Sequence, residues 1–88
     1  MRIAVRRSGG FAGIERQVEV DTSAREDEAR LRALAERAVS DGHGAPPPGV
    51  PDGFTYRITV DGRTAHCADP LLSAAQRELV ALVLGEGA

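Results

Sequence analysis

The chain holds few residues whose types and spacing would support covalent or metal chemistry. It has one cysteine and two histidines among 88 residues. Cys67 directly follows His66, and both lie in a segment with the alternating pattern of a strand. Because neighbouring strand residues point to opposite faces of a sheet, these two side chains cannot ligate one metal or act as a nucleophile–base pair. We predict that Cys67 is a small core residue and that His66 is an exposed strand residue.

The other histidine and the acidic residues complete no catalytic or metal site. His43 lies in a segment rich in Pro and Gly with Asp41 nearby, and two potential ligands do not make a zinc site. The acidic run at residues 26–28 is typical of a solvated first turn of a helix. The sequence offers no Ser/His/Asp set. It therefore predicts a protein that is not an enzyme, with no catalytic residue, no metal and no cofactor.

A glycine-rich segment, SGGFAG at residues 8–13, is the most distinctive short pattern in the chain. It lacks the Gly-Lys-Ser/Thr ending of a P-loop, and it joins two strands, so no helix N-terminus faces a phosphate there. Phe11, near the middle of this segment, leaves two interpretations open. Its side chain either folds back onto the sheet or protrudes as an apolar anchor for a partner's pocket.

Length and composition predict one soluble globular domain over residues 1–88. Apolar residues make up 42% and charged residues 27%, and no stretch has the length of a membrane span or the apolar core of a secretory signal. The single cysteine fits a reducing compartment, so we expect a cytoplasmic protein. The formal net charge of −2 argues against a dedicated nucleic-acid binder.

The first element is a predicted hairpin over residues 2–21. Apolar residues alternate with polar ones on both sides of the glycine-rich segment. Pairing Val5 with Val18 and Ile3 with Val20 places four apolar side chains on one face. The same register sets three pairs on the other face: Arg2 with Asp21, Arg6 with Gln17, and Ala4 with Glu19.

A helix over about residues 24–40 is predicted next, because Ser23 and Glu26 match a capping box. The apolar stripe of this helix consists of Leu31, Leu34, Ala35, Ala38 and Val39. The following segment, residues 41–53, holds several prolines and glycines and cannot be helix or central strand. It is either a flexible spacer or a contact that its prolines preorganise.

A second hairpin, over residues 54–67, turns at Asp61-Gly62, which favours a type I′ turn. This turn sets Ile58 opposite Ala65 and Tyr56 opposite Cys67 on the inner side, and Thr59 opposite Thr64 and Arg57 opposite His66 on the outer side. A last helix over about residues 70–84 is predicted to begin at Asp69-Pro70, with Asp69 as N-cap and Pro70 at the first helical position. Its predicted stripe is Leu72, Ala75, Leu79 and Val83, and Gly85 ends it.

The element order is therefore ββαββα, an α+β fold. Each hairpin has one polar face, so we expect both helices to cover the same apolar face of an antiparallel sheet.

The opening residues, MRIAVRRSGGFAGI at 1–14, resemble the start of the emfourin family. These small bacterial proteins inhibit thermolysin-like zinc metallopeptidases of the protealysin kind, and chain length and element order agree with the family. The resemblance implies a protein inhibitor whose partner supplies the zinc. It also implies that the rigid glycine-rich tip of the first hairpin, residues 10–13, presents a bulky side chain to the apolar pocket beside that metal.

We predict that the partner-binding surface combines the glycine-rich tip with part of the Pro-rich segment. The residues assigned to it are Ser8, Gly9, Gly10, Phe11, Ala12, Gly13, Ile14, His43, Pro46, Pro47 and Pro48. The expected partner is a thermolysin-like zinc metallopeptidase, not a nucleic acid or a membrane, and the free protein is expected to be monomeric.

Two alternatives stay open beside inhibition. The chain would otherwise serve as a non-catalytic regulatory or assembly module that binds another intracellular protein. Nucleic-acid binding through Arg2, Arg6 and Arg57 is the weaker alternative, because Glu15 and Glu19 share that face and it has no aromatic platform.

Overall fold

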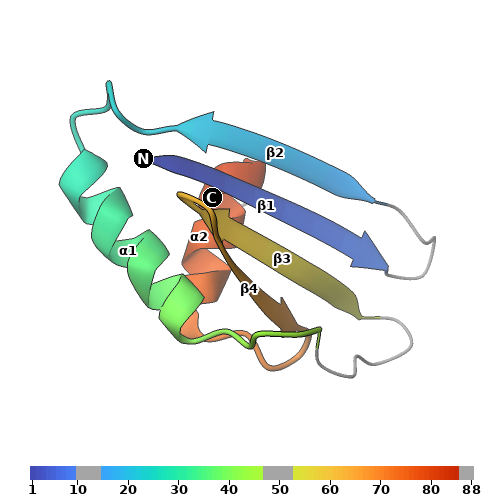
Figure 1. Ribbon diagram of the computed structural model, residues 1–88. Helices are drawn as coiled ribbons and strands as arrows, with labels where there is room; N and C mark the ends of the chain where they lie inside the picture. The colour runs from blue at the N-terminus through green and yellow to red at the C-terminus, as the bar shows by residue number, and fades with distance from the viewer. Residues whose placement is uncertain (10–14, 47–52, 86–88) are drawn as a thin grey trace.

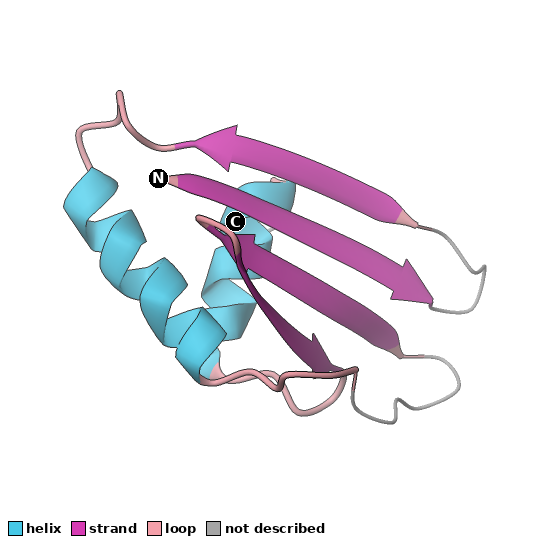
Figure 2. Cartoon of the chain, viewed as in Figure 1, coloured by secondary structure: helices cyan, strands magenta, loops and turns pink. Residues whose placement is uncertain are grey.

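Each of two β-hairpins is followed by a helix in the computed structural model, which describes residues 1–9, 15–46 and 53–85 (Figure 1). The elements are β1 (Arg2–Gly9), β2 (Arg16–Asp21), α1 (Glu28–Ser40), β3 (Phe54–Val60), β4 (Arg63–Ala68) and α2 (Ala74–Leu84). This order confirms the predicted ββαββα arrangement. The fold is an α+β fold with one sheet and two helices (Figure 2).

The sheet has four strands in the order β2-β1-β3-β4, and every neighbouring pair is antiparallel. The predicted register of the first hairpin is confirmed, with Val5 opposite Val18 and Ile3 opposite Val20. The two hairpins join through β1 and β3, where Val5 lies opposite Ile58. Alternation alone does not predict that join, because it says which face a residue takes and not which strand lies beside it.

The second hairpin also has its predicted register, with Ile58 opposite Ala65 and Tyr56 opposite Cys67. Its turn residues Asp61 and Gly62 have φ angles of 48° and 85°. Positive φ at both central positions is what a type I′ turn requires, and its twist matches that of the strands.

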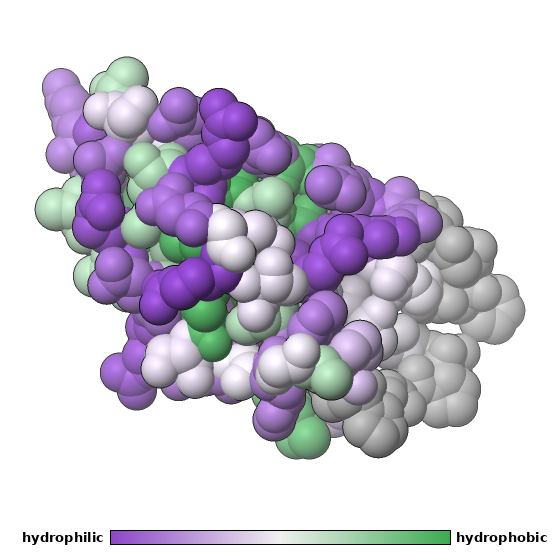
Figure 3. Space-filling view, viewed as in Figure 1, coloured by the Kyte–Doolittle hydropathy of each residue, from purple (hydrophilic) through white to green (hydrophobic). Residues whose placement is uncertain are grey.

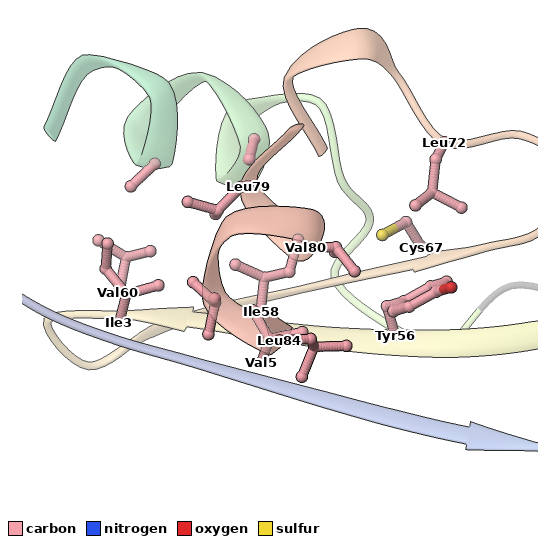
Figure 4. Packing of buried hydrophobic residues seen from close by; sticks show 13 residues of the cluster. Ile3, Val5, Tyr56, Ile58, Val60, Cys67, Leu72, Leu79, Val80 and Leu84 are labelled. Atoms are coloured by element: carbon pink, nitrogen blue, oxygen red, sulfur yellow. The ribbon is translucent and has the colours of Figure 1, made fainter. Parts of the chain in front are cut away.

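Both helices pack on the same face of the sheet, as expected. Figure 4 shows strand side chains such as Ile3, Ile58 and Val60 directed towards them. The buried apolar residues of the two helices are Leu31, Ala35 and Ala38 of α1 and Leu79, Val80, Val83 and Leu84 of α2. The helices are also tied by a buried amide, because Gln76 Nε2 donates to the Ala38 carbonyl at 3.1 Å.

The first helix begins later than the sequence predicts, so the capping box at Ser23 is wrong. Helix α1 starts at Glu28 after Asp27, and Asp27 makes no side-chain cap hydrogen bond. The Ser23 N–H donates to Asp21 Oδ1 at 2.9 Å, and the Arg25 N–H donates to the Thr22 carbonyl at 3.0 Å. These local bonds hold the residues after β2 in a turn, which competes with an earlier helix start.

The second helix also begins later, and the predicted cap at Asp69-Pro70 is wrong. Helix α2 is capped by Ser73, whose hydroxyl accepts the Gln76 N–H at 3.1 Å while Gln76 Oε1 accepts the Ser73 N–H at 2.9 Å. Asp69 is engaged elsewhere, because its carboxylate accepts the Phe54 N–H at 3.0 Å. This bond directs the Asp69 carboxylate to the start of β3, and the helix begins at the next capping box along the chain.

Hydrophilic side chains dominate the surface in the view of Figure 3. Neither α1 nor α2, the helices of the described chain, has the length and apolar character needed to cross a bilayer.

Candidate functional site

The end of β1 and the start of β3 lie side by side at one end of the sheet. The first leads into the glycine-rich segment, and the second follows the Pro-rich segment. The pairing of β1 with β3 sets Gly9, the last residue of β1, opposite Phe54, the first residue of β3 (Figure 1). The chain therefore enters residues 10–14 and leaves residues 47–52 at adjacent strand ends. The described strand ends that flank these two segments therefore lie side by side.

Gly9 is needed for this close approach. Its φ is +100°, and a Cβ added there would lie 3.0 Å from the Gly53 carbonyl oxygen. Positive φ disfavours an L side chain, and the Gly53 backbone oxygen would have to shift to accept one. Gly9 thus holds the two strand ends together, a structural role in addition to the predicted contact.

Ser8, the residue before Gly9, is held in place by two contacts with Thr55. Ser8 Oγ lies 2.9 Å from Thr55 Oγ1, and Thr55 Oγ1 donates to the Ser8 carbonyl at 3.3 Å. With the single Thr55 hydroxyl proton on that carbonyl, the Ser8 hydroxyl donates to Thr55. Ser8 therefore braces the strand end, and only its acceptor capacity stays open to a partner.

Phe54 is a further residue of this region that sequence reasoning did not assign. The Arg7 guanidinium carbon lies 4.6 Å from the centre of the Phe54 ring, a cation–π contact. The Phe54 ring lies 6.3 Å from the Tyr56 ring, and its carbonyl accepts the Asp69 N–H at 2.9 Å. These contacts secure the base of the segment that precedes β3.

The Pro-rich segment begins alongside β4. His43 and His66 exchange two backbone hydrogen bonds, each 2.8 Å long, in an antiparallel bridge. The chain comes close enough because Gly42 has no side chain, since a Cβ there would lie 2.7 Å from the Ala65 Cβ. His43 is exposed, as a contact residue must be, but His66 is half-buried and not exposed as predicted. The bridge explains the difference, because it lays the segment against His66.

A shallow pocket of about 220 Å³ lies on the sheet face opposite the helices, beside this region. Its lining residues are Arg6, Ser8, Pro46, Thr55, Tyr56, Arg57, His66 and Cys67. Ser8 and Pro46 are predicted contact residues, and the structure brings them to one pocket. Arg6, Arg57 and His66 were not assigned to the site, although the predicted register already set Arg57 opposite His66.

The structure describes only four of the eleven residues predicted for the partner-binding surface. The other seven lie outside the described residues: Gly10, Phe11, Ala12, Gly13, Ile14, Pro47 and Pro48. Both interpretations of Phe11 therefore stay predictions. The same holds for the choice between spacer and contact in the Pro-rich segment.

Cys67 is buried, as predicted, and its environment makes it a poor nucleophile. Burial raises the pKa of the Cys67 thiol from its usual 9.0 to about 11, and the negative charge of Asp69 acts in the same direction. The reactive thiolate is therefore scarce at neutral pH. Within residues 1–9, 15–46 and 53–85, no three His, Cys, Asp or Glu side chains are grouped so that they would hold a metal ion.

Comparison with known proteins gives one match. The sequence model of the Emfourin family matches residues 5–84, which is nearly the whole chain and far more than the opening motif. No curated protein and no solved structure gives a significant match.

Proposed function

The chain belongs to the Emfourin family, and from that premise we propose that it binds and blocks the active-site cleft of a thermolysin-like, protealysin-type zinc metallopeptidase. Membership in this family fits a protease-inhibitor role rather than an enzyme role. In this proposal the zinc belongs to the target, and the inhibitor brings no metal or cofactor of its own. We place the activity in the cytoplasm, where a lone cysteine such as Cys67 stays reduced.

The observation that carries the proposal is the pairing of Gly9 with Phe54. It anchors the glycine-rich tip and the Pro-rich segment at adjacent strand ends, so one partner surface can reach both. A loop that blocks a cleft must keep its shape when bound, and rigid flanks lower the entropy lost on binding. The Ser8–Thr55 hydroxyl pair and the Arg7–Phe54 contact supply such flanks.

In the proposed mechanism, the tip enters the cleft and Phe11 occupies the apolar pocket beside the target's zinc. The neighbouring glycines and alanine add little bulk, so the backbone fits a narrow groove. If the peptidase cut within residues 10–14, β1 and β2 would still hold both new ends, because their pairing extends to Arg7 opposite Arg16. Held ends favour re-joining over release and keep the cleft occupied.

A titration tests this proposal directly. A fixed amount of a purified thermolysin-like peptidase is assayed on a peptide substrate while this protein is added. We expect activity to fall to zero near one equivalent, and substrate to compete with the protein. Activity should not return when zinc is added, because the protein blocks the cleft and does not remove the metal. Full activity at a large excess of protein would refute the proposal, and recovery with zinc would indicate chelation instead.

A second candidate, a regulatory or assembly module, is favoured by an apolar surface away from the tip. Leu71 is 86% exposed, and a groove of about 420 Å³ nearby is lined in part by Pro70, Val80 and Ala81. Exposed apolar patches often mark contacts with other proteins. This candidate predicts that Leu71→Asp abolishes partner binding, whereas the inhibitor proposal predicts that inhibition is unchanged.

A further inference from the structure

Four basic side chains lie in a line across the sheet face that the helices leave uncovered. The strand registers set Arg6 opposite Arg57, and Arg57 opposite His66, and the bridge sets His66 opposite His43. Residues directly opposite each other project to the same face of a sheet. We call Arg6, Arg57, His66 and His43 the basic row.

Arg57, in the middle of the basic row, has no carboxylate partner among the described residues. Arg6 forms an ion pair with Glu15, and Arg2 on the same face pairs with Glu19 at 3.4 Å. Arg57 is exposed, and its neighbours along β3 on this face are Thr55 and Thr59, which are uncharged. Within the described part of the chain, its guanidinium charge is therefore not offset by a carboxylate.

This arrangement is unfavourable for the isolated protein. Like charges directly opposite each other in a sheet destabilise it, and Arg57 lies opposite Arg6. Glu15 offsets the charge of Arg6, whereas no described carboxylate offsets that of Arg57. A local conflict of this kind is expected where a residue serves binding rather than folding. The ligand that would relieve it is anionic.

The pocket beside the basic row has the size and the donors for a carboxylate. Its volume of about 220 Å³ exceeds several times the roughly 30 Å³ that a water molecule occupies. The hydroxyls of Ser8 and Thr55 bond each other, so the side-chain donors left to a ligand are the guanidinium N–H groups of Arg6 and Arg57 and the imidazole N–H of His66. A guanidinium group binds a carboxylate through two parallel hydrogen bonds, which adds geometric specificity.

We propose that the basic row docks an acidic segment of the partner protein, with an Asp or Glu carboxylate seated in the pocket against Arg57. The pocket is lined by Ser8, which lies just before the glycine-rich tip, so a partner that grips the tip also reaches Arg57. The identity of that partner as a peptidase rests on the proposed function. The docking chemistry rests only on the basic row and its pocket.

Inhibition by charge variants tests the docking surface on the peptidase itself. We expect Arg57→Gln to weaken inhibition about tenfold and Arg57→Glu more, because a charge-assisted hydrogen bond is lost and then a repulsion is added. The matched control is Arg63→Glu, since Arg63 lies on the same hairpin, is exposed and has no ion pair among the described residues. It should inhibit within about twofold of the wild type.

Two results of this assay would overturn the proposal. One is Arg57→Glu inhibiting as strongly as the wild type. The other is equal weakening by the variants at Arg57 and Arg63, which would reveal a general charge effect. If the wild-type protein does not inhibit the peptidase at all, the proposed function fails, and the docking chemistry is decided by the next measurement.

That measurement is an NMR titration of the ¹⁵N-labelled protein with a tetraglutamate peptide and, separately, with a short oligothymidylate. We expect the peptide at millimolar concentration to shift the amides of Arg57 and His66, and Arg57→Gln to abolish those shifts. The absence of peptide-induced shifts in the wild type would overturn the proposal. Tighter binding of the oligonucleotide at the same residues would also overturn it, in favour of a nucleic-acid surface.

Discussion

The two faces of the sheet contrast sharply in what their side chains do. On the face under the helices, Ile3, Val5, Ile58 and Val60 are each at most 1% exposed. On the opposite face, the basic row places like charges in adjacent strands beside a pocket. The buried apolar side chains of the covered face stabilise the fold, whereas the uncovered face carries arginines directly opposite each other. We therefore expect changes on the covered face to alter stability, and changes on the uncovered face and at the tip to alter binding.

The largest expected effect is on the covered face, at Leu79. This side chain is fully buried, so Leu79→Ala should lower the free energy of unfolding by about 3 kcal/mol through lost contacts and the cavity left behind. The measurement is urea denaturation, and the matched control is Leu82→Ala on the same helix, where Leu82 is 50% exposed. A loss at Leu82 as large as that at Leu79 would contradict the assignment of the core.

The next effect is at the tip and concerns binding. We expect Phe11→Ala to weaken inhibition by about 2 kcal/mol with little change in melting temperature, and Phe11→Asp to weaken it further. The rival interpretation, a Phe11 folded onto the sheet, predicts a loss of about 3 kcal/mol of stability instead. A variant that melts early but still inhibits at wild-type strength would exclude Phe11 as an anchor.

The burial of Cys67 on the covered face is tested by the pH dependence of the free energy of unfolding. Because the pKa of the folded thiol, about 11, lies above its usual 9.0, the unfolded chain releases this proton first as pH rises. The contribution of Cys67 to stability is therefore complete below pH 9 and is lost between pH 9 and 11. Cys67→Ala should lower stability by roughly 1 kcal/mol at neutral pH and flatten the alkaline fall. Rapid reaction of the wild-type thiol with a thiol reagent at pH 7 would show that Cys67 is not buried.

The smallest expected effect is an increase in stability, caused by a change on the uncovered face that also weakens binding. Arg57→Glu replaces a like-charge pair with Arg6 by an opposite-charge pair, so it should raise the free energy of unfolding by about 0.5 kcal/mol while weakening inhibition. Thermal unfolding at low salt measures the change. A lower melting temperature would mean that Arg57 supports the fold and not a partner.

The two faces also explain what could be predicted from the sequence. Alternation and the Asp61-Gly62 turn were enough for both hairpin registers, because a slip of one residue would expose the apolar set. The pairing of β1 with β3 joins residues far apart in the chain, and no short-range pattern encodes it. The Arg57–His66 pair was therefore foreseen, but the full basic row was not.

Both helix starts were misplaced for the same physical reason. The Asp21 carboxylate accepts the Ser23 N–H, and the Asp69 carboxylate accepts the Phe54 N–H. Either bond fixes the chain locally in a turn or against a strand, which residue preferences alone do not reveal. The cap of α2, the Ser73 and Gln76 box, is visible in the sequence, but Asp69-Pro70 matches the start of a helix equally well four residues earlier.

The most direct test of the account is hydrogen–deuterium exchange on this protein alone and in complex with a thermolysin-like peptidase. We expect the complex to slow exchange at residues 8–16 and 46–57, which include the tip, the segment before β3 and Arg57. Exchange in α1 and α2 should be unchanged, because the proposed partner surface does not include these helices. Protection confined to α2 and the residues around Leu71, with none at the tip, would contradict the account and favour an assembly module.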